Sequence, residues 1–561
     1  MLKKTVSGIL LILLLTSVLI LAFNIPQVKA DAQTVYINAD GSITPSTAPI
    51  TTSDNITYTL NGNISYPTYC GVVGGYTTPV NVGIVVERSN IVIDGNGFTV
   101  QGNSSWAQGS SPAYGLSLTS VSNVTVENVN IQYFEVGILI SLFRGADPNN
   151  NSIIGNTITN TCYGIYFDQY SNNNTAIGNN ITANNGAGII FSSSYNSISG
   201  NTITTNGAGI YLSDSISDNI IGNNINGSNI MEDYAFGILD NGGCNYTSIT
   251  GNNIAGNAEY GIVLDPVSIN DSIIGNNIAD TYYSVLLASS SNNTIYHNNF
   301  VGPVVLASVD STSVGNVWDN GYPSGGNYWS DYQSLYPNAA EIDNSSIWNT
   351  PYVIDASDID HYPLMNPYVP TGLKVTVPIN AEVFLVFDAV TAAGFATAVT
   401  TISYPPPPSS TSSGSSTGSA TTTSSYTPLS SASYFIPPVW IITTTAKFSG
   451  MVTVGIAYPS TASPTQMWQT DIVPGDVNHD GVVNLKDLLL ILQAMGSSPG
   501  SPRWNPNCDL DGNRKIDIGD LLIALKNYGK TSKWTNITWY VDTVNHIIYG
   551  RTDHFSLIAI H

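Results

Sequence analysis

The chain has 561 residues, and its 15 Lys and Arg against 38 Asp and Glu give a formal net charge of −23. So large a surplus of carboxylates repels nucleic acid and anionic lipid, and it suits divalent cations. The four cysteines are scattered, at positions 70, 162, 244 and 508, and predict no disulfide framework.

The first thirty residues have the pattern of a secretory signal peptide. Lys3 and Lys4 precede an apolar run over residues 9–23, and Val28-Lys29-Ala30 offers a small-residue cleavage site. We expect residues 1–30 to be removed on export, and a retained membrane anchor is the alternative. No later stretch of the sequence reaches the roughly 20 apolar residues of a membrane span. The mature chain is therefore expected to be secreted, with cell-surface attachment possible by other means.

Asn-x-Ser/Thr sequons, the acceptor triplets for N-glycosylation, are dense in this chain. They begin at Asn55, Asn63, Asn103, Asn123, Asn150, Asn173, Asn180, Asn226, Asn245, Asn270, Asn292, Asn344 and Asn536. An exported chain of this kind is expected to be a glycoprotein. A repeat rich in Asn and Thr also generates such triplets by chance.

Residues 31–150 contain a loose repeat that becomes regular from residue 151. Between residues 151 and 300 one phrase recurs seven times, from IGNTI at 154–158 to HNNF at 297–300. Its Asn falls at positions 156, 179, 201, 223, 252, 276 and 298, and each phrase is followed by an apolar pulse such as Tyr163-Gly164-Ile165. A period of about 22 residues, built of short alternating runs broken by Gly, Asn and Ser, predicts three short strands per coil of a parallel β-helix. Residues 31–150 then supply an N-terminal cap and the first coils.

We expect the repeated Asn to occupy a left-handed corner of each coil, with its amide bonded to the amide one coil away. One spacing, between positions 223 and 252, is longer than the others and places an insertion around residues 228–234. Insertions in such repeats map to a loop on one face, which is often the functional face.

An aromatic, Gly-rich segment follows the repeat at residues 317–332 and continues to Met365. Together with the Asn ladder it resembles the NosD-like family, named for a periplasmic copper-accessory protein, over roughly residues 80–368. The resemblance implies a right-handed parallel β-helix over residues 151–368 that ends in an aromatic cap. Residues 341–348 depart from the family, which carries an acidic DGIGD-type element there. The alternative role of Trp318, Tyr322, Tyr328 and Trp329 is to stack on sugar rings.

Copper is not expected in the β-helix. Its histidines are His297 and His361, and its methionines are few, whereas copper prefers imidazole and sulfur ligands. His297 stands in the Gly column of the repeat, which predicts a corner residue instead.

Residues 372–473 and 531–561 contain alternating apolar patterns that predict a small antiparallel β-sandwich. A Ser/Thr/Pro-rich loop at residues 405–433 interrupts it, and its composition cannot form a packed core. Residues 474–530 form a second insertion with a different pattern.

This second insertion contains two loops with the spacing of an EF-hand calcium site, each followed by an apolar helix. The side-chain ligands predicted by that spacing are Asp476, Asn478, Asp480, Asn484 and Asp487 in the first loop and Asp509, Asp511, Asn513, Asp517 and Asp520 in the second, with the main-chain carbonyls of Val482 and Lys515. Calcium is a hard cation that takes six to eight oxygens, and this spacing wraps them around one point. Two copies 33 residues apart make Ca²⁺ the expected cofactor.

The pair resembles a type I dockerin, a module that tethers carbohydrate-active enzymes to a cohesin in a calcium-dependent manner. The resemblance implies a cohesin-type partner. Arg514 stands where the loop normally has Gly, and the recognition positions 10 and 11 differ between the copies: Leu485-Lys486 against Ile518-Gly519. The alternative is a calcium-stapled structural insert in the sandwich.

The β-helix shows no clear catalytic set. Between Asp31 and Leu373 the only cationic side chains are Arg88 and Arg144, which argues against a polysaccharide lyase. Asp168 and Asp265 are expected four coils apart, roughly 19 Å, too far for the paired carboxyls of a hydrolase.

Asp240, near Glu232 and Asp233 of the insertion, forms the best remaining acid cluster. We expect a structural or carbohydrate-binding protein, with a surface glycan as a possible ligand. The alternative is a polysaccharide-active glycoside hydrolase or lyase held by its dockerin.

Overall fold

The computed structural model describes residues 34–65, 81–102, 113–142, 145–184, 186–205, 207–227, 235–257, 259–279, 281–302, 304–380, 382–401, 439–471, 473–478 and 481–560. The predicted signal peptide, the insertion at 228–234, the loop at 405–433 and Asp480 lie outside these residues. The chain divides into two compact units. The first comprises the residues up to Ile295 with Gly302–Val317 and Val353–Ile359, and the second comprises Tyr296–Val301, Trp318–Tyr352 and the chain from Asp360 onward.

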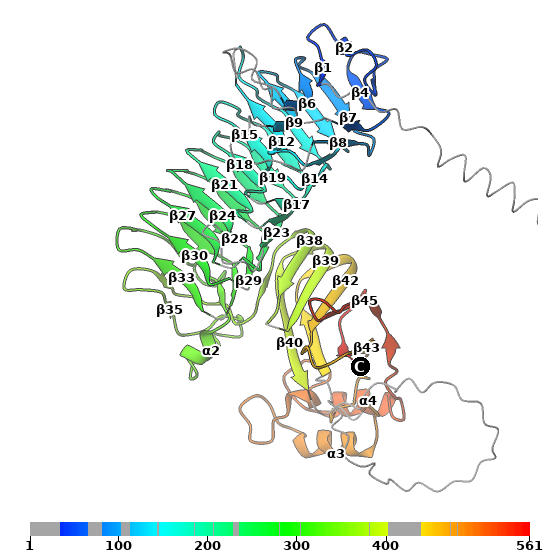
Figure 1. Cartoon of the computed structure of the whole chain (residues 1–561). Helices are drawn as coiled ribbons and strands as arrows, with labels where there is room; N and C mark the ends of the chain where they lie inside the picture. Colours follow the sequence, from blue (N-terminus) through cyan, green and yellow to red (C-terminus); the bar gives the residue numbers. More distant parts are fainter. Residues whose placement is uncertain are drawn as a thin grey trace, which may run out of the picture. The chain divides into compact units, whose positions relative to one another are not determined.

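The first unit is a parallel β-helix whose coils each give one strand to each of three sheets (Figure 1). The first sheet has the order β2 (Ile43–Thr44), β1 (Val35–Ile37), β6 (Asn81–Val86), β9 (Ala113–Thr119), β12 (Val136–Ser141), β15 (Tyr163–Phe167), β18 (Ile189–Phe191), β21 (Ile210–Ser213), β24 (Phe236–Asn241), β27 (Tyr260–Asp265), β30 (Tyr283–Leu287) and β33 (Val305–Val309). The second has the order β3 (Ile50–Thr51), β4 (Thr57–Leu60), β7 (Ile91–Asp94), β10 (Val124–Glu127), β13 (Ser152–Ile154), β16 (Thr175–Ile177), β19 (Ser197–Ser199), β22 (Asn219–Ile221), β25 (Ser248–Thr250), β28 (Ser272–Ile274) and β31 (Thr294–Tyr296).

Within this unit the third sheet runs β29 (Asn277–Ala279), β26 (Asn253–Ala255), β23 (Asn224–Gly227), β20 (Thr202–Thr205), β17 (Asn180–Asn184), β14 (Thr157–Thr159), β11 (Asn130–Gln132), β8 (Thr99–Gln101) and β5 (Ile64–Ser65). Nearly all strand contacts are parallel; the antiparallel pairs β1–β2 and β3–β4 lie at the start of the chain. Successive coils bury aligned apolar residues such as Ile165, Ile189 and Ile210. This column of Ile side chains is the core that one coil could not bury alone.

The repeated Asn column lies inside the β-helix and joins the coils through side-chain hydrogen bonds. Asn201 Oδ1 accepts from the main-chain N–H of Asn179 at 2.9 Å, and Asn201 Nδ2 donates to the Ala176 carbonyl at 2.9 Å. The predicted amide-to-amide bonds are present, as between Asn201 Nδ2 and Asn223 Oδ1 at 2.9 Å. The predicted left-handed corner is one residue off: positive φ belongs to the preceding residue, such as Gly200 at +62° and His297 at +56°.

A second internal ladder lies before the strands of the second sheet, and its members are Asn151, Asn174, Asn196, Asp218, Thr247, Asp271, Asn293 and Asn316. Each Asn or Asp side chain of the column accepts from the main-chain N–H one coil earlier, as Asn196 Oδ1 does from Asn174 and Asp218 Oδ1 from Asn196, at 2.9 and 2.7 Å. Thr247 Oγ1, in the same column, has no hydrogen-bond partner among the described residues. The Asn members also use Nδ2 as a donor: Asn196 Nδ2 reaches the Ser193 carbonyl at 2.9 Å. An Asp has no such donor when it is ionised.

The two Asp members of this ladder are buried without a counter-charge. Asp218 and Asp271 are fully buried, and among the described residues no donor reaches Oδ2 of either. Burial, assisted by the nearby Asp240 carboxyl, raises the pKa of Asp218 to about 7 and that of Asp271 to about 8. The sequence contains neither Lys nor Arg between Arg144 and Lys374. The neutral acid, whose O–H can donate as an Asn amide does, is therefore the form that fits the ladder.

A glycine column explains the second apolar pulse of the repeat. A Cβ built on Gly209 would lie 2.3 Å from Ile225 Cγ2 and 2.5 Å from the Gly237 carbonyl oxygen. The strand therefore passes too close to its neighbours for any side chain at this position.

The second unit begins with the aromatic segment. It contains β32 (Asn299–Val301), which pairs with β34 (Tyr328–Trp329), and the short helix α2 (Tyr332–Leu335); β35 (Tyr352–Val353) and β36 (Ile359–Asp360) pair with each other. Asp360 is buried in this aromatic segment, and its Oδ2 accepts from the Asn327 main-chain N–H at 2.7 Å and from Trp329 Nε1 at 2.8 Å. Burial raises the pKa of Asp360 to about 7.

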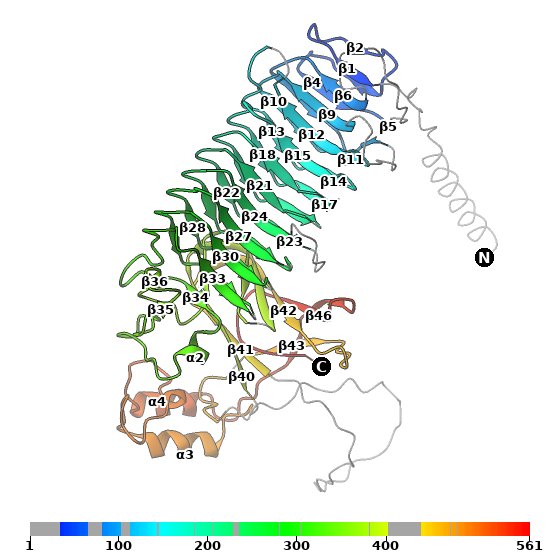
Figure 2. The same ribbon diagram turned by 60° about the vertical axis from the view of Figure 1, so that its left-hand side comes forward.

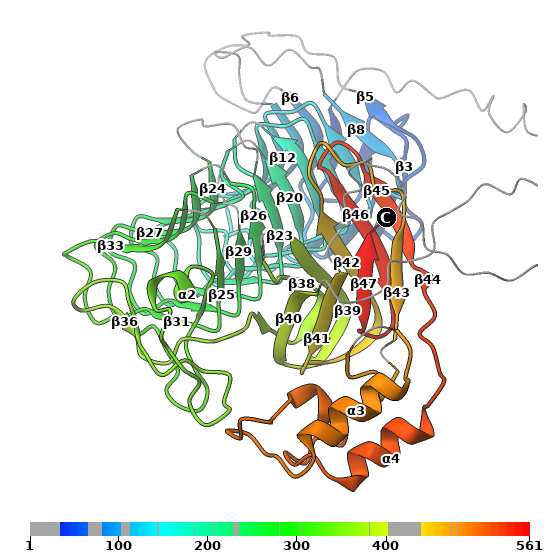
Figure 3. The same ribbon diagram turned by 90° about the horizontal axis from the view of Figure 1, so that it is seen from below.

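The β-sandwich follows. One sheet has the order β37 (Tyr368–Val369), β40 (Gly394–Thr401), β41 (Val439–Thr444), β47 (Leu557–Ile560), β43 (Met467–Thr470) and β44 (Thr535–Asn536); the other has the order β38 (Gly372–Pro378), β39 (Val383–Ala392), β42 (Lys447–Ala457), β46 (Ile547–Thr552) and β45 (Thr538–Asp542). The strands of the two sheets are labelled in Figure 3. The sheets share one core that includes Phe387, Trp440 and Ile558. Helices α3 (Leu485–Ala494) and α4 (Ile518–Lys526) interrupt the sandwich between β43 and β44. The predicted mainly β fold, a parallel β-helix and then a β-sandwich with an inserted helical pair, is confirmed.

Candidate metal centre

The two predicted calcium loops lead directly into α3 and α4, which pack side by side (Figure 2). A small core holds this module together: Val477, Leu488, Ile491, Ala494, Cys508, Ile516 and Ala524. Burial beside the Asp520 and Asp487 carboxylates raises the pKa of the Cys508 thiol to about 11. Two of these residues, Val477 and Ile516, lie between ligand positions, so each loop contributes an apolar side chain of its own to this core.

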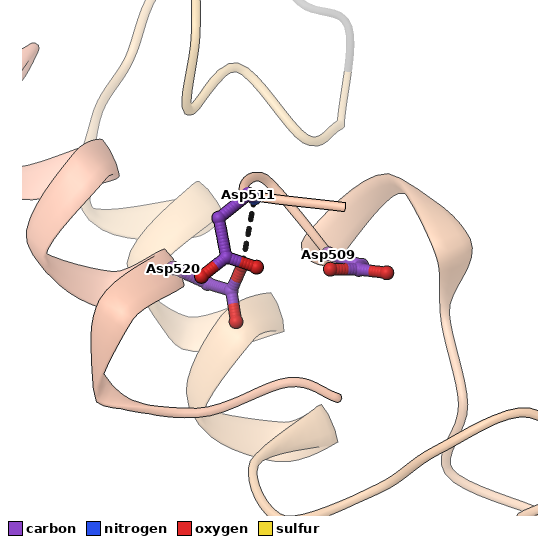
Figure 4. Close-up of side chains that lie close together, drawn as sticks. All are labelled: Asp509, Asp511 and Asp520. Carbon is purple, nitrogen blue, oxygen red and sulfur yellow. Dashed lines mark hydrogen bonds between the residues drawn. The ribbon is translucent and has the colours of Figure 1, made fainter. Parts of the chain in front are cut away.

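In the second loop three carboxylates converge, as Figure 4 shows. Each of Asp509, Asp511 and Asp520 offers one oxygen, and these oxygens lie within 4.8 Å of one another. Asp509 Oδ1 is buried and, among the described residues, has no hydrogen-bond donor. Like charges at this distance repel, and an orphaned buried carboxylate oxygen is costly, so the donor set calls for a cation. Carboxylate oxygens are the ligands that calcium prefers.

Both loops share one hydrogen-bond scheme. The position-1 carboxylate accepts from the position-6 N–H: Asp476 Oδ2 from Gly481 at 3.0 Å and Asp509 Oδ2 from Arg514 at 2.9 Å. The position-12 carboxylate accepts from the position-2 N–H: Asp487 Oδ1 from Val477 at 3.0 Å and Asp520 Oδ1 from Leu510 at 2.6 Å. The first loop is therefore wrapped in the same way as the second.

Positions 9 and 12 of each loop also start the following helix. Asn484 is the N-cap of α3 and Asp487 is its third residue, and their side chains and main-chain N–H groups bond reciprocally as a capping box. Asp517 and Asp520 repeat this arrangement at α4. The helix dipole favours these carboxylates, so helix and loop fix each other.

Arg514 occupies the left-handed corner that the loop demands, with φ of +64°, where the first loop has Gly481 at +84°. A residue with a Cβ pays steric strain there that Gly does not. Of the predicted ligands in the first loop, Asp480 lies outside the described residues.

Sequence reasoning missed a pair of exposed apolar stripes on the helices. Leu485, Leu489 and Leu492 on α3 correspond, 33 positions later, to Ile518, Leu522 and Leu525 on α4. Each of the six is between 48% and 61% exposed. Their i, i+4, i+7 spacing resembles that of a core face, and only the structure shows that the cores lie on the opposite sides. Position 10, which begins each stripe, is Leu485 in one copy and Ile518 in the other, so it is aliphatic in both, whereas position 11 changes from Lys486 to Gly519.

The acids considered for catalysis are not brought together. Asp240 is 0% exposed and stands in register between Leu212 and Leu264, so it faces the interior; its Oδ1 accepts from Ser268 Oγ at 2.9 Å. The strand registers place Asp168 and Asp265 four coils apart. Glu232 and Asp233 lie outside the described residues.

The aromatic residues considered for sugar stacking are mostly internal. Trp318 and Trp329 are each 1% exposed, and Trp329 stacks on Tyr352 with ring centroids 4.0 Å apart. Tyr322, at 46%, remains accessible.

The two β-helix histidines do not form a copper site. His297 donates from Nε2 to the Ser324 carbonyl at 2.9 Å and stacks on Tyr368, whereas His361 Nδ1 bonds Asp319 Oδ2 at 3.0 Å. Among the described residues, the group of His, Cys, Asp and Glu side chains that could hold a metal is Asp509, Asp511 and Asp520, with neither imidazole nor sulfur. The donors present do not fit copper.

Comparison with known proteins agrees with this architecture. The family model described as periplasmic copper-binding protein (NosD) matches residues 44–238 and 224–334, together more than half of the chain. The type I dockerin domain model matches residues 474–528. No curated protein sequence matches this chain. Among the described residues, no helix is both long and apolar enough to cross a membrane.

Solved structures give a distant likeness. The periplasmic alginate epimerase AlgG is 15% identical, with a TM-score of 0.36, over 49% of this chain and 72% of its own. The DFA-IIIase from Arthrobacter chlorophenolicus A6 in complex with GF2 is 14% identical, with a TM-score of 0.35, over 43% of this chain and 68% of its own. These values carry no functional argument. On the family match and the three-sheet coil, the chain belongs to the NosD family of parallel β-helix proteins, and it carries a type I dockerin domain.

Proposed function

We propose that the chain is an exported protein in which the β-helix is a rigid scaffold and the dockerin domain tethers it, through calcium, to a cohesin-type partner. The observation that carries the proposal is the pair of matching exposed stripes, each directly after a calcium loop. Six aliphatic side chains about half exposed on so small a module are unfavourable in water, and a partner surface would bury them. Their equivalence allows the partner to bind either helix.

Calcium controls this surface through the capping boxes. A bound cation would neutralise the carboxylates at positions 1 and 12 of each loop, together with Asp511 at position 3 of the second loop, and position 12 would stay fixed at the first turn of its helix. Without the cation the loops lose that neutralisation, and the helices lose the anchor that sets their orientation. Docking is therefore expected to require calcium.

The test is binding of the full chain to a panel of immobilised cohesin domains, in calcium and in a chelator. Wild type should bind in calcium only, and the Leu489→Asp, Leu522→Asp double variant should not bind, although it still binds calcium. Val544→Asp is the matched control, because Val544 is an exposed apolar residue outside the module. Failure of the wild type to bind any cohesin would contradict docking.

One observation favours a second candidate, a calcium-stapled insert. The first loop is bonded to the end of the module: Val483 N–H donates to the Lys530 carbonyl at 3.0 Å, and Gly529 N–H donates to the Val483 carbonyl at 2.8 Å. Calcium would then stabilise the sandwich without any partner. Thermal unfolding with and without chelator separates the two candidates. The insert predicts that calcium raises the unfolding temperature strongly, that the Leu489→Asp, Leu522→Asp double variant keeps this effect, and that the wild-type chain binds no cohesin.

For the β-helix, carbohydrate binding is the function we propose, with catalysis as the alternative. Tyr170, Tyr195 and Tyr246 are 59–61% exposed and offer ring surface to a sugar. The best acid for hydrolysis, Asp240, is closed off from any polysaccharide. A glycan array should show retention, and a polysaccharide panel should release no reducing sugar; release that Asp240→Ala abolishes would establish the enzyme instead.

A further inference from the structure

One corner of the β-helix, just before the second sheet, has a single backbone conformation in every coil. The strand residues Thr57, Val92, Thr125, Ser152, Thr175, Ser197, Asn219, Ser248 and Ser272 are in register, and β31, beginning at Thr294, follows in the sheet. The residues two positions earlier, which we call the asparagine corner, are Asn55, Asn90, Asn123, Asn150, Asn173, Tyr195, Ser217, Tyr246, Asn270 and Asn292. All have φ between +56° and +62°.

The corner is a line of sequons. Six of its members begin Asn-x-Ser/Thr: Asn55, Asn123, Asn150, Asn173, Asn270 and Asn292. The left-handed conformation favours Asn. The residue two positions later begins the next strand, where Thr is favoured, so the fold itself favours an Asn-x-Ser/Thr triplet in successive coils. All six asparagines are exposed.

We propose that the asparagine corner is a row of N-glycosylation sites, modified with oligosaccharide from a lipid-phosphate-linked donor. In this transfer Nδ2 bonds to the anomeric carbon of the sugar and loses a proton, and the lipid phosphate leaves. The modification is bulky and soluble, and a site on an exposed turn accommodates it. The proposal rests on export, which is part of the proposed function.

Two sequons outside the corner, at Asn63 and Asn245, have side-chain amides that are held in hydrogen bonds to the main chain. In the corner, Asn123 Nδ2 donates to the exposed side chain of Asn90 at 2.9 Å. Asn63 Oδ1 accepts from the Thr99 N–H at 2.9 Å. Asn245 Nδ2 donates to the Gly243 carbonyl at 2.8 Å while its Oδ1 accepts from Ile269 at 3.0 Å. These two asparagines are expected to stay unmodified, and they serve as controls within the same molecule.

The distance between coils limits how many neighbouring asparagines of the corner can carry a glycan at the same time. Asn123, Asn150 and Asn173 lie on successive coils, about 4.8 Å apart. An oligosaccharide is wider than this, so the middle site, Asn150, should carry the least glycan. Tyr195, Ser217 and Tyr246 interrupt the row and leave a bare window with two exposed aromatic rings.

The experiment is glycopeptide mass spectrometry on the full chain isolated from its native host. Digestion must cut at acidic residues, because trypsin has no site between Arg144 and Lys374. The expected result is glycan on corner asparagines and none on Asn63 or Asn245. Thr175→Val should remove the glycan from Asn173 and raise occupancy at Asn150, while it keeps the left-handed Asn and a strand-forming residue.

Two results would overturn the proposal, and they are distinguishable. Unmodified corner asparagines in a chain that has lost residues 1–30 would refute the glycan row and leave export intact. A chain that keeps residues 1–30 inside the cell would refute the glycan row and the export in the proposed function together.

Discussion

The neutral-acid ladder makes a prediction about stability and pH. Asp218→Asn and Asp271→Asn replace the two buried acids with the residue that the rest of the ladder uses, at nearly the same size. The pKa of each acid is raised in the folded chain, so folding holds a proton that the unfolded chain releases. The stability that this proton provides is complete below pH of about 4 and is lost as the pH rises through the folded pKa. The stabilising contribution is therefore lost as the pH rises through about 7 for Asp218 and about 8 for Asp271.

The magnitude follows from these values. A folded pKa of about 7 for Asp218 against about 3.9 unfolded corresponds to roughly 4 kcal/mol lost across the window. For a domain of this size, 1 kcal/mol moves the unfolding temperature by about 2–4 °C, so Asp218→Asn should unfold on the order of 10 °C higher than wild type at pH 8. At pH 4 the wild-type acids are protonated in the folded state and about half protonated in the unfolded state, so the difference between the two proteins should nearly vanish.

The assay is thermal unfolding by circular dichroism at fixed calcium, from pH 4 to pH 8. Infrared absorption of protonated carboxyl groups gives a direct readout, because the wild-type minus double-variant difference isolates these two acids from Asp240 and Asp360. Asp265→Asn, on the outward face, is the control and should leave the pH profile unchanged. A wild-type-to-variant difference that is constant across pH would refute the reasoning.

Three further predictions concern the loops and the coil. Arg514→Gly should relieve about 1 kcal/mol of left-handed strain and tighten calcium binding at the second loop about fivefold, measured by calorimetry; weaker binding would contradict the strain argument. Gly209→Ala should cost about 1–3 kcal/mol or more from overpacking, whereas Gly222→Ala, with no atom within 4 Å of the added Cβ, should cost only its positive φ; equal unfolding temperatures would contradict this. Asn201→Ala should cost several kcal/mol, because it leaves the Asn179 N–H and the Ala176 carbonyl unpaired at about 1–3 kcal/mol each; a neutral effect in chemical denaturation would show that the ladder is dispensable.

The coil and its first Asn ladder could be predicted from the sequence because both repeat at one spacing. The pattern did not show which residue of the Gly-Asn pair turns the corner, since both tolerate positive φ. In the structure Gly200 turns and Asn201 points inward, because the amide must reach two neighbouring coils.

The second ladder was not predicted because its column mixes Asn, Asp and Thr. Asn196 and Asp218 have no common sequence pattern, and their shared role as acceptors appears only when strand register aligns them. Asp240 was predicted, with Glu232 and Asp233, as the best remaining acid cluster, because a polar residue in an apolar alternation indicates a special position. The structure shows that Asp240 is fully buried.

The two loops and the helix after each could be predicted from the sequence, because the ligand spacing of such loops is set by the size of the ion; the ligand set itself stays a prediction. The stripes on α3 and α4 could not, because an i, i+4, i+7 pattern of Leu is the usual sign of a core. A helix in a module of this size has apolar residues on two sides, and the structure shows that Leu488 faces the core while Leu489 faces solvent.

Calcium titration of the full chain by calorimetry tests the central claim most directly. Two binding events per chain are expected, one of which Asp476→Ala should remove and the other Asp509→Ala, and cohesin binding should fall with each. Absence of heat from the wild-type chain on addition of calcium would contradict the assignment of the paired loops as a metal centre, and with it calcium-dependent docking.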